Sequence, residues 1–337
     1  MRNRLYDWKV LSSIRFDLPT IAVGNLSVGG AGKSPHVEYL ISLLKEDFAV
    51  ATLSRGYARK TQGYLFATEN STALEIGDEP ALFHQKFPEV AVGVGENRVL
   101  ALPQLLMDAP ATQVVILDDA FQHRSIHPGL NILVTEYHRR FTRDHIVPLG
   151  RLRESRAGYL RADLIVVSKC PPDLSLEQCT LISREIAPAP GQELFFTTMC
   201  NEDPWSLVQG ERIQLTSRFH VLLVTGIADA GPLRNYLSGV CGELVHMRFP
   251  DHHSYKSRDL QAILEQFQMI KEEPRIILTT EKDAMRLKLL RQEFPEWFPC
   301  YAIGVRPVFL FDGQDNFGRR IFDYIRWERK RIGEENE

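Results

Sequence analysis

The sequence lacks any long hydrophobic run. No stretch of about 18 consecutive apolar residues occurs, and a helix that crosses a bilayer needs roughly 20 of them. The N-terminus also lacks the short apolar core and the small-residue cleavage site of a signal peptide. We therefore expect a protein without a transmembrane helix.

Cysteine is scarce. The five cysteines are odd in number, and no two are spaced as Cys-x-x-Cys. This pattern argues against a disulfide framework and against a structural zinc site. We expect reduced cysteines that fill space in the core. They are Cys170, Cys179, Cys200, Cys241 and Cys300.

The chain also lacks a strong charge of one sign. Lys and Arg number 40 against 43 Asp and Glu, for a formal net charge of -3. Proteins that grip nucleic acid through its phosphates usually carry a basic field. The composition therefore argues against nucleic-acid binding and leaves only a local basic patch open. Nothing in the sequence indicates an obligate protein partner.

What the sequence does have is the composition of a globular enzyme, with 44% hydrophobic and 25% charged residues. Short apolar runs alternate with helical stretches. This order predicts an α/β fold, with a mostly parallel sheet covered by helices on both faces as in P-loop NTPases. The expected strands cover residues 19–23, 48–53, 90–94, 114–117, 130–134 and 164–167.

The strand and helix pattern is interrupted once. An irregular stretch runs over 201–217, after which apolar strands return at 221–224 and 275–280. A chain of 337 residues is long enough for two domains. We predict a larger N-terminal α/β domain over residues 1–200 and a smaller C-terminal α/β domain over 201–337.

A candidate phosphate-binding loop lies between the first strand and the following helix. The pattern G-x-x-x-x-G-K-[ST] is met at its end, while Ser27 replaces its first glycine. Lys33 is expected to reach the β- and γ-phosphates of ATP, and Ser34 to bind Mg²⁺. The alternative is an ordinary glycine-rich turn. The predicted ATP-binding residues are Ser27, Val28, Gly29, Gly30, Ala31, Gly32, Lys33 and Ser34.

Two aspartates end the most β-branched strand of the chain, at Asp118 and Asp119. P-loop enzymes hold the magnesium shell at such a place. One carboxylate is expected to hold the metal, and the other to contact a metal-bound water or the substrate. The alternative is a polar turn after a strand. The predicted metal site is Ser34, Asp118 and Asp119.

A kinase that phosphorylates an alcohol needs a base for the hydroxyl proton. Asp78 lies in a polar turn before a predicted helix, where it is either such a base or a helix cap. His252 stands between Asp251 and His253, and a carboxylate beside an imidazole suits proton relay. On these residues alone, a surface histidine pair is the favoured interpretation.

Several arginines are candidates for binding an anionic substrate. Arg55 follows a predicted strand, and a guanidinium there is a natural anion clamp. A basic run further on either binds an anionic group or forms a solvated face. Its members are Arg151, Arg153, Arg156 and Arg161.

The first 15 residues combine basic and apolar side chains. The apolar positions recur every three residues, close to one helical face, and such a segment can lie on an anionic membrane surface. The alternative is a surface helix packed on its own domain. The apolar positions are Leu5, Trp8, Leu11 and Ile14, and the basic ones are Arg2, Arg4, Lys9 and Arg15.

Together these motifs resemble those of the tetraacyldisaccharide 4′-kinase family, the lipid A 4′-kinases of bacteria with an outer membrane. Within this family the missing first glycine of the loop is part of the pattern. The resemblance spans roughly residues 20 to 285 and keeps the order of the motifs. It is carried by residues 23–35, 53–57, 77–80, 116–124, 249–255 and 279–284.

The resemblance implies transfer of the γ-phosphate of ATP to the 4′-hydroxyl of a lipid A disaccharide 1-phosphate. It also implies Mg²⁺ and a peripheral position on the cytoplasmic face of the inner membrane. Asp78 becomes the expected base, paired with His252, and the N-terminal segment becomes an expected membrane contact. The other residues implied in catalysis are Lys33 and Asp119, and those implied in substrate binding are Asn25, Arg55, His123 and Arg153.

The chain departs from the family pattern at a few places. Ala120 stands where glycine is usual, and Ala31 stands where a polar residue is common. The stretch 148–154 follows its pattern only loosely, and the N-terminal extension looks short. The length of that extension bears on how deeply the protein inserts into a membrane.

Other functions fit the sequence less well. A P-loop kinase for another alcohol or sugar is the nearest alternative. A GTPase switch would show Asn-Lys-x-Asp after a strand, and the comparable 168–171 stretch lacks both the Asn and the Asp. A binding module without activity fits poorly with an intact Lys33, Ser34 and aspartate pair.

Overall fold

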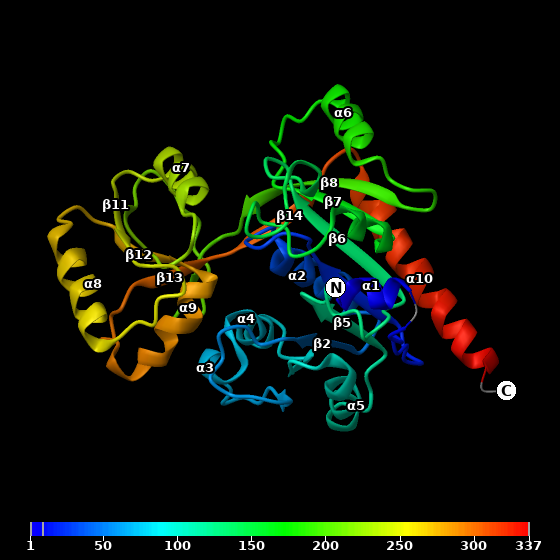
Figure 1. Ribbon diagram of the computed structural model, residues 1–337. Helices are drawn as coiled ribbons and strands as arrows, with labels where there is room; N and C mark the ends of the chain where they lie inside the picture. Colours follow the sequence, from blue (N-terminus) through cyan, green and yellow to red (C-terminus); the bar gives the residue numbers. More distant parts are fainter. Residues whose placement is uncertain (1, 9, 336–337) are drawn as a thin grey trace. The chain divides into compact units, whose positions relative to one another are not determined.

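The computed structural model describes residues 2–8 and 10–335 (Figure 1). The chain forms two compact units. The large unit comprises Met1–Ser71, Phe83–Cys200 and Arg306–Glu337, and the small unit comprises Thr72–Leu82 and Asn201–Val305. The predicted division at residues 200 and 201 differs from these units in its assignment of 72–82 and 306–337.

The large unit is built on a nine-stranded sheet with the order β14-β8-β7-β6-β1-β5-β2-β4-β3. The pairings from β8 to β4 are parallel, and β3 adds an antiparallel edge. Every residue of β1, β2, β5 and β7 is buried, as expected for strands covered on both faces. The predicted α/β fold with a mostly parallel sheet is thereby confirmed. The strands are β1 (Thr20–Gly24), β2 (Val50–Ser54), β3 (Leu65–Phe66), β4 (Ala91–Val94), β5 (Val114–Asp118), β6 (Leu130–Glu136), β7 (Leu164–Ser168), β8 (Glu193–Asn201) and β14 (Val305–Phe309).

Helices follow the strands in the order expected of a parallel sheet. α2 packs against β1 and β5, and α5 packs against β2 and β4. The α-helices of this part of the chain are α1 (Arg2–Asp7), α2 (Lys33–Leu44), α5 (Arg98–Asp108), α6 (Leu176–Ile186) and α10 (Gly313–Glu335), together with the end of α4 (Asp78–Lys86), whose first residues belong to the small unit. Two 3₁₀ helices, η1 (Phe141–Arg143) and η2 (Arg156–Arg161), lie in the long connection from β6 to β7.

The last residues return to the large unit because they complete its sheet and its core. The backbone N–H of Leu310, just after β14, donates to the carbonyl of Phe196 on β8 over 3.0 Å. Phe317, Ile321 and Ile325 on one side of α10 are each at most 1% exposed. Burial of these side chains favours α10 packed on the large unit over α10 free in solvent.

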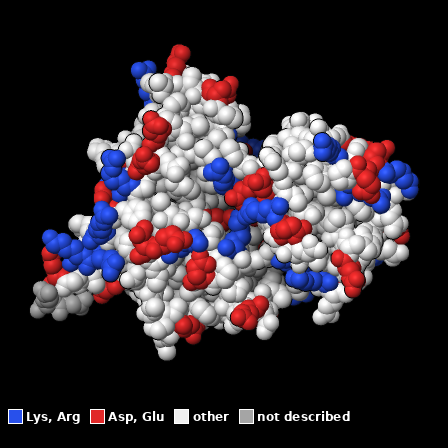
Figure 2. Space-filling model, turned by 180° about the vertical axis from the view of Figure 1, so that it is seen from behind, with Lys and Arg blue, Asp and Glu red and all other residues white. Residues whose placement is uncertain are grey.

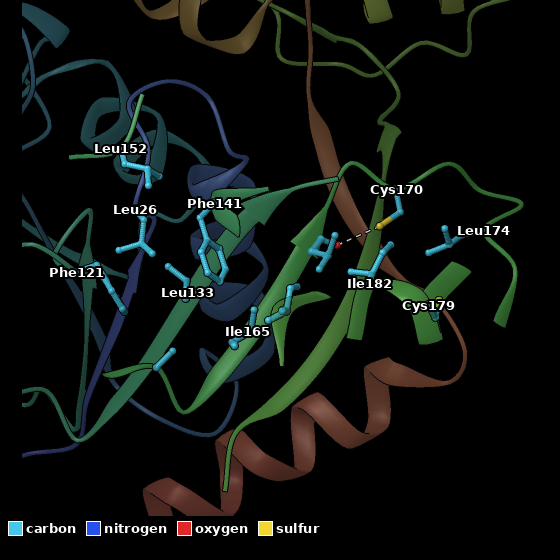
Figure 3. Packing of buried hydrophobic residues seen from close by; sticks show 13 residues of the cluster. Leu26, Phe121, Leu133, Phe141, Leu152, Ile165, Cys170, Leu174, Cys179 and Ile182 are labelled. Atoms are coloured by element: carbon cyan, nitrogen blue, oxygen red, sulfur yellow. Dashed lines mark hydrogen bonds between the residues drawn. The ribbon is translucent and has the colours of Figure 1, made fainter. Parts of the chain in front are cut away.

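A buried cluster includes the residue just before the phosphate loop, Leu26 (Figure 3). Leu26, Phe121, Leu133, Phe141 and Leu152 belong to it, from five separate segments of the chain. Cys170 lies in the same cluster and donates from Sγ to the carbonyl of Val167 over 3.2 Å. All five cysteines are free, as expected from their spacing.

The N-terminal segment is helical over a shorter stretch than its periodicity indicates. α1 ends at Asp7, and Ile14 instead forms a parallel bridge with Ile126 beside the sheet. The helical interpretation of residues 5–14 is therefore wrong beyond Asp7. Trp8 and Val10 are nonetheless 67% and 66% exposed. Lys9 and the side chains of Arg2 and Arg4 lie outside the described residues.

The small unit holds a five-stranded sheet with the order β11-β10-β12-β13-β9, parallel except at β9. The predicted strands at 221–224 and 275–280 correspond to β10 and β12, which are adjacent inner strands of this sheet. Its strands are β9 (Trp205–Ser206), β10 (His220–Thr225), β11 (Leu244–Arg248), β12 (Arg275–Thr280) and β13 (Cys300–Ile303). Its helices are α3 (Ala73–Ile76), α7 (Gly231–Val240), α8 (Ser257–Met269), α9 (Glu281–Leu287) and η3 (Lys288–Glu293).

Charge and hydropathy match the expectations from composition. On the face shown in Figure 2, Lys and Arg lie interspersed with Asp and Glu. Within residues 2–8 and 10–335, no helix combines the length and the apolar character that crossing a membrane requires.

Candidate functional site

The predicted phosphate loop connects β1 to α2. Gly29 and Gly32 have φ angles of 104° and 86°, in the left-handed region that favours glycine. A Cβ at Gly32 would also lie 2.8 Å from Cε of Met199. Ser27, in contrast, forms an antiparallel bridge with Leu152. The loop therefore turns at its later glycines, and the absence of the first glycine of the motif does not disturb it.

Lys33 is held by two side chains. Its Nζ lies 3.2 Å from Oδ1 of Asn25 and 3.4 Å from Oδ1 of Asp119. Nη1 of Arg153 contacts the same carboxylate, at 3.1 Å from Oδ1 and 3.0 Å from Oδ2. Burial acts to raise the pKa of Asp119, but Lys33 and Arg153 outweigh it and hold that pKa below its ordinary value. Two predicted anion-binding cations thus share one carboxylate.

The adjacent aspartates have different surroundings. Asp118 ends β5, is 7% exposed, and accepts a hydrogen bond at Oδ2 from Oγ of Ser54 over 3.4 Å. Asp119 has a φ of 46°, which turns the chain directly after the strand. Its carboxylate reaches Lys33, whereas that of Asp118 lies beside the end of β2. The two predicted metal ligands therefore do not play the same part.

Arg98 supports both aspartates and was not predicted. It begins α5, is 2% exposed, and donates from Nη2 to the carbonyls of Asp118 and Asp119 over 3.4 and 3.2 Å. Burial lowers the pKa of its guanidinium, and the two carboxylates oppose that effect. Its sequence position could have indicated this role. Arg98 follows the predicted strand 90–94 by a few residues, and the carboxyl end of that strand lies at the same edge of the sheet as Asp118.

The predicted substrate-binding residues lie at the same end of the sheet but differ in their contacts. Asn25 is 1% exposed, and its Nδ2 has no hydrogen-bond partner within the described part of the chain. Arg55 follows β2 and is exposed. Nε2 of His123 accepts a hydrogen bond from the backbone N–H of Arg98 over 3.3 Å. That nitrogen is engaged within the protein, and a substrate role for His123 stays a prediction.

The small unit contains the second predicted group. Asp78 is the first residue of α4 and is 8% exposed. Arg286 on α9 donates from Nε to Oδ2 of Asp78 over 3.0 Å, and its Nη2 contacts the same oxygen. Charge-assisted hydrogen bonds of this kind are the strongest that side chains form. The Asp78 side chain is thus engaged with α9 rather than acting only as a cap for its own helix.

His252 joins this pair through the same guanidinium. Its Nδ1 lies 3.6 Å from Oδ2 of Asp78 and 3.1 Å from Nη2 of Arg286. A guanidinium only donates, so Nδ1 accepts and the proton of a neutral His252 is on Nε2. Nε2 lies 3.9 Å from Oδ2 of Asp251. The predicted pairing of Asp78 with His252 is present, with Arg286 as the group that links them.

The position of Arg286 is fixed from behind. Its Nη1 donates to Oδ1 of Asp283 over 3.2 Å and to the carbonyl of Gly226 over 3.1 Å. Asp283 is fully buried and accepts at Oδ2 from the N–H of Gly226 over 3.0 Å. Burial raises the pKa of Asp283, against the opposing effects of Gly226 and Arg286. Arg286 lies three residues after Asp283 on one helix face, a spacing that could have indicated it.

The neighbouring charged residues form separate pairs. Nε2 of His253 lies 2.9 Å from Oδ2 of Asp259, and its ring stacks on Phe249. Lys282 lies 2.6 Å from Glu79. Burial acts to raise the pKa of Glu79, and Lys282 outweighs it and lowers that pKa. Of the two adjacent histidines, His253 stabilises its own loop, whereas His252 faces Asp78.

One further group of side chains has a geometry compatible with a metal. Ligand atoms of His220, Glu243 and Glu272 lie within 4.8 Å of one another in the small unit. The two glutamates are exposed. This group contains none of the predicted site residues.

Comparison with known proteins agrees with this geometry. The family model described as LpxK, tetraacyldisaccharide-1-P 4′-kinase, matches residues 1–325. The tetraacyldisaccharide 4′-kinase of Bacteroides thetaiotaomicron is 42% identical, over 97% of this chain and 89% of its own length. That of Flavobacterium johnsoniae is also 42% identical, over 97% of this chain and 93% of its own.

The structural comparison covers both units. The crystal structure of LpxK from Aquifex aeolicus in complex with ATP is similar, with a TM-score of 0.72 and 31% sequence identity. The match covers 96% of this chain and 94% of that one. With the glycine turns, Lys33 and the paired aspartates in place, the chain belongs to the LpxK family, the tetraacyldisaccharide 4′-kinases of lipid A biosynthesis.

Proposed function

We propose that this chain transfers the γ-phosphate of ATP to the 4′-hydroxyl of a tetraacyl glucosamine disaccharide 1-phosphate, with Mg²⁺. The observation that carries the proposal is the environment of Lys33. Its ammonium group lies beside Asn25 and Asp119 at a loop whose glycines already have the turned conformation. A P-loop enzyme needs a lysine at that place to hold the β- and γ-phosphates.

Residues 27–34 are proposed to bind the phosphates of ATP, the phosphate donor. Backbone N–H groups in a glycine-rich turn and at the start of a helix bind phosphate oxygens. Gly32 leads directly into α2, so the N–H groups at the start of that helix are the candidates, whereas the N–H of Ala31 donates to the carbonyl of Gly29 over 3.1 Å. Lys33 then exchanges Asp119 for phosphate oxygens when ATP binds, and Arg153 continues to hold Asp119.

The residues at the start of α2 and the end of β5 suit magnesium. Mg²⁺ prefers hard oxygen ligands, commonly one or two protein groups together with phosphate and water. Ser34 supplies a hydroxyl and Asp118 a buried carboxylate whose Oδ2 accepts from Ser54. When bound, the ion neutralises charge on the transferring phosphate. Asp119, engaged by two cations, is the better candidate for holding Lys33 and for contacting a metal-bound water.

Asp78 is the proposed base for the acceptor. Arg286 occupies Oδ2, which leaves Oδ1 to accept the proton of the 4′-hydroxyl. The hydroxyl oxygen then forms the bond to the γ-phosphorus, and ADP leaves with the bridging oxygen. His252, with its proton on Nε2, holds the pair in register and completes the proposed catalytic set with Lys33 and Asp119.

The identity of the acceptor is tested by comparing candidate substrates. Purified protein with γ-labelled ATP should label a tetraacyl disaccharide 1-phosphate, and should not label simple sugars or nucleosides at comparable concentrations. Labelling of simple sugars at equal rates would favour the alternative, a P-loop kinase for another alcohol.

We also propose peripheral binding to the inner-membrane surface through the N-terminal segment. Trp8 and Val10 are exposed apolar side chains next to a short helix, and exposed apolar groups in a basic segment favour an anionic bilayer. Trp8→Ser with Val10→Ser should reduce co-sedimentation with anionic vesicles. These substitutions leave the Arg15–Glu328 ion pair of 2.6 Å in place. Undiminished sedimentation would remove these side chains from the membrane contact.

A further inference from the structure

Two carbonyl groups of the phosphate loop are bound by side chains from behind. Oγ of Ser168 donates to the carbonyl of Ala31 over 2.6 Å. Nδ1 of His36 lies 2.7 Å from the carbonyl oxygen of Gly32. Ser168 is fully buried and His36 is 1% exposed. We refer to these two hydrogen bonds as the carbonyl clamp.

The proton positions in the clamp follow from its chemistry. A carbonyl oxygen only accepts, so Nδ1 of His36 carries the proton and Nε2 is the acceptor. Nε2 lies 3.2 Å from Oγ1 of Thr197 on β8, which therefore donates to it. Burial lowers the pKa of His36 to about 4, although the hydrogen bond to Gly32 acts in the opposite direction. His36 is thus neutral and held in one tautomer near pH 7.

The serine of the clamp also has one preferred partner. Its Oγ lies 2.6 Å from the carbonyl oxygen of Ala31 and 3.3 Å from that of Thr135. The hydroxyl has a single proton to donate. The shorter distance is the stronger hydrogen bond. Ser168 ends β7, so a fully buried inner strand of the sheet supports the loop at this point.

The clamp determines where two N–H groups point. A peptide unit is planar and trans, so its C=O and N–H bonds point in opposite directions. The carbonyl of Ala31 shares its peptide unit with the N–H of Gly32, and the carbonyl of Gly32 shares its unit with the N–H of Lys33. With both carbonyls bound by Ser168 of β7 and His36 of α2, both N–H groups point away from those side chains.

We propose that His36 and Ser168 are positioning residues that aim the Gly32 and Lys33 amides at the phosphates of ATP. Neither side chain touches the nucleotide, and each acts through a backbone carbonyl. The inference rests on the proposed binding of ATP at residues 27–34. Its physical basis is preorganisation, because amides already fixed in place need no reordering when the anion arrives.

The test compares two amides at position 36. The amide nitrogen of His36→Asn falls near Nδ1 and can still donate to Gly32, whereas that of His36→Gln falls near Nε2 and cannot. Calorimetric titration with ATP should show a Kd raised about tenfold in His36→Gln and by no more than about threefold in His36→Asn. At saturating ATP, kcat should stay within about twofold in both variants, because the reacting groups are unchanged.

Controls separate positioning from general destabilisation. Thr197→Val removes the partner of Nε2 alone and should leave ATP affinity nearly native. Ser168→Ala should weaken ATP binding as His36→Gln does, and it serves as the second variant if His36→Gln does not fold. Equal ATP affinity in the Asn and Gln variants, or native affinity in both His36→Gln and Ser168→Ala, would overturn the clamp.

The outcomes also distinguish the clamp from the proposed reaction. Tight ATP binding by the native protein without labelling of the disaccharide would refute the acceptor and leave the clamp standing. Absence of ATP binding by the native protein would refute both.

Discussion

Each unit holds a carboxylate by cations, but in opposite ways. In the large unit, the side chain of Asp119 is 30% exposed and lies between the ends of two long, separate side chains, Lys33 and Arg153. In the small unit, the side chain of Asp78 is 11% exposed and faces the 7% exposed guanidinium of Arg286. Arg286 is itself fixed by Gly226.

The difference indicates what each site can do. Lys33 can leave Asp119 for a phosphate, because partly exposed ion pairs are worth little and exchange readily. Arg286 is also held by Asp283 and Gly226, and separating it from Asp78 would leave a buried carboxylate without its cation, which costs several kcal/mol. The phosphate site is thus built to rearrange on binding, and the proposed base is built to stay in place.

The largest effect is expected on removal of Lys33, the cation that can exchange Asp119 for phosphate. Lys33→Ala should lower phosphorylation of the disaccharide by about 10³-fold or more, because phosphate charge then develops without its main partner. The measurement is the steady-state rate with labelled ATP. Lys45→Ala is the matched control, since Lys45 pairs with Glu89 on the surface. Native turnover in Lys33→Ala would contradict the role of the loop.

A second prediction concerns the buried support of the exchangeable site. An unfolded chain takes up a proton on His36 near pH 6.5, whereas burial keeps the pKa of the folded state at about 4. The unfolded state binds more protons in this window, so stability falls as the pH falls. The contribution is about 3 kcal/mol between pH 7 and pH 4, at roughly 1.4 kcal/mol per pKa unit.

Urea unfolding of the native protein and of His36→Asn over that pH range measures this contribution. The difference in unfolding free energy between the two should shrink toward acid pH, since only the native chain carries the imidazole. Parallel curves for the two proteins would show that His36 is not buried as described.

Removing the fixed carboxylate should have a smaller effect, confined to the chemical step. Asp78→Asn keeps the shape of the side chain but cannot take the hydroxyl proton, so kcat should fall by about 10²-fold with ATP KM nearly unchanged. Asp173→Asn, at an exposed turn of the large unit, provides a control for loss of one negative charge. A loss seen only in ATP KM would instead place Asp78 among the nucleotide contacts.

The smallest effect tests whether Arg286 acts through Asp78. Arg286→Lys keeps the charge but loses the simultaneous contacts to Asp78, His252 and Gly226, and kcat should fall about tenfold. In an Asp78→Asn background the same change should have little further effect on kcat, because the group it orients is no longer a base. Additive losses would show that Arg286 supports the fold of the small unit alone.

The sequence predicts best those features that local chemistry determines. Strand ends at Gly24 and Asp118, and the glycines at 29 and 32, follow from short-range rules on turns and buried strands. These rules predicted the α/β fold, the loop at Lys33 and the aspartates after β5, whereas Asn25 was named only through the resemblance to the family. They did not separate Asp118 from Asp119, because that difference depends on the backbone turn at Asp119 and on partners far along the chain.

The features that were missed all depend on tertiary contacts. Arg98 and Arg286 look like ordinary surface arginines until their helices dock, and both are then buried. The periodicity of residues 5–14 suited a helix, but pairing of Ile14 with Ile126 prevailed over it after Asp7. Local propensity is a weak guide where the sheet offers a competing hydrogen-bond partner.

The return of β14 and α10 to the large unit has a consequence for synthesis. The chain leaves the ribosome from its N-terminus, so the sheet that carries the phosphate loop has to wait for residues 306–335. Tyr324 of α10 donates its hydroxyl to the carbonyl of Thr20 at the start of β1 over 3.1 Å. The small unit is translated in full before this contact can form. A nascent chain stalled at residue 305 would therefore display an uncovered strand edge, and it would be a natural substrate for chaperones.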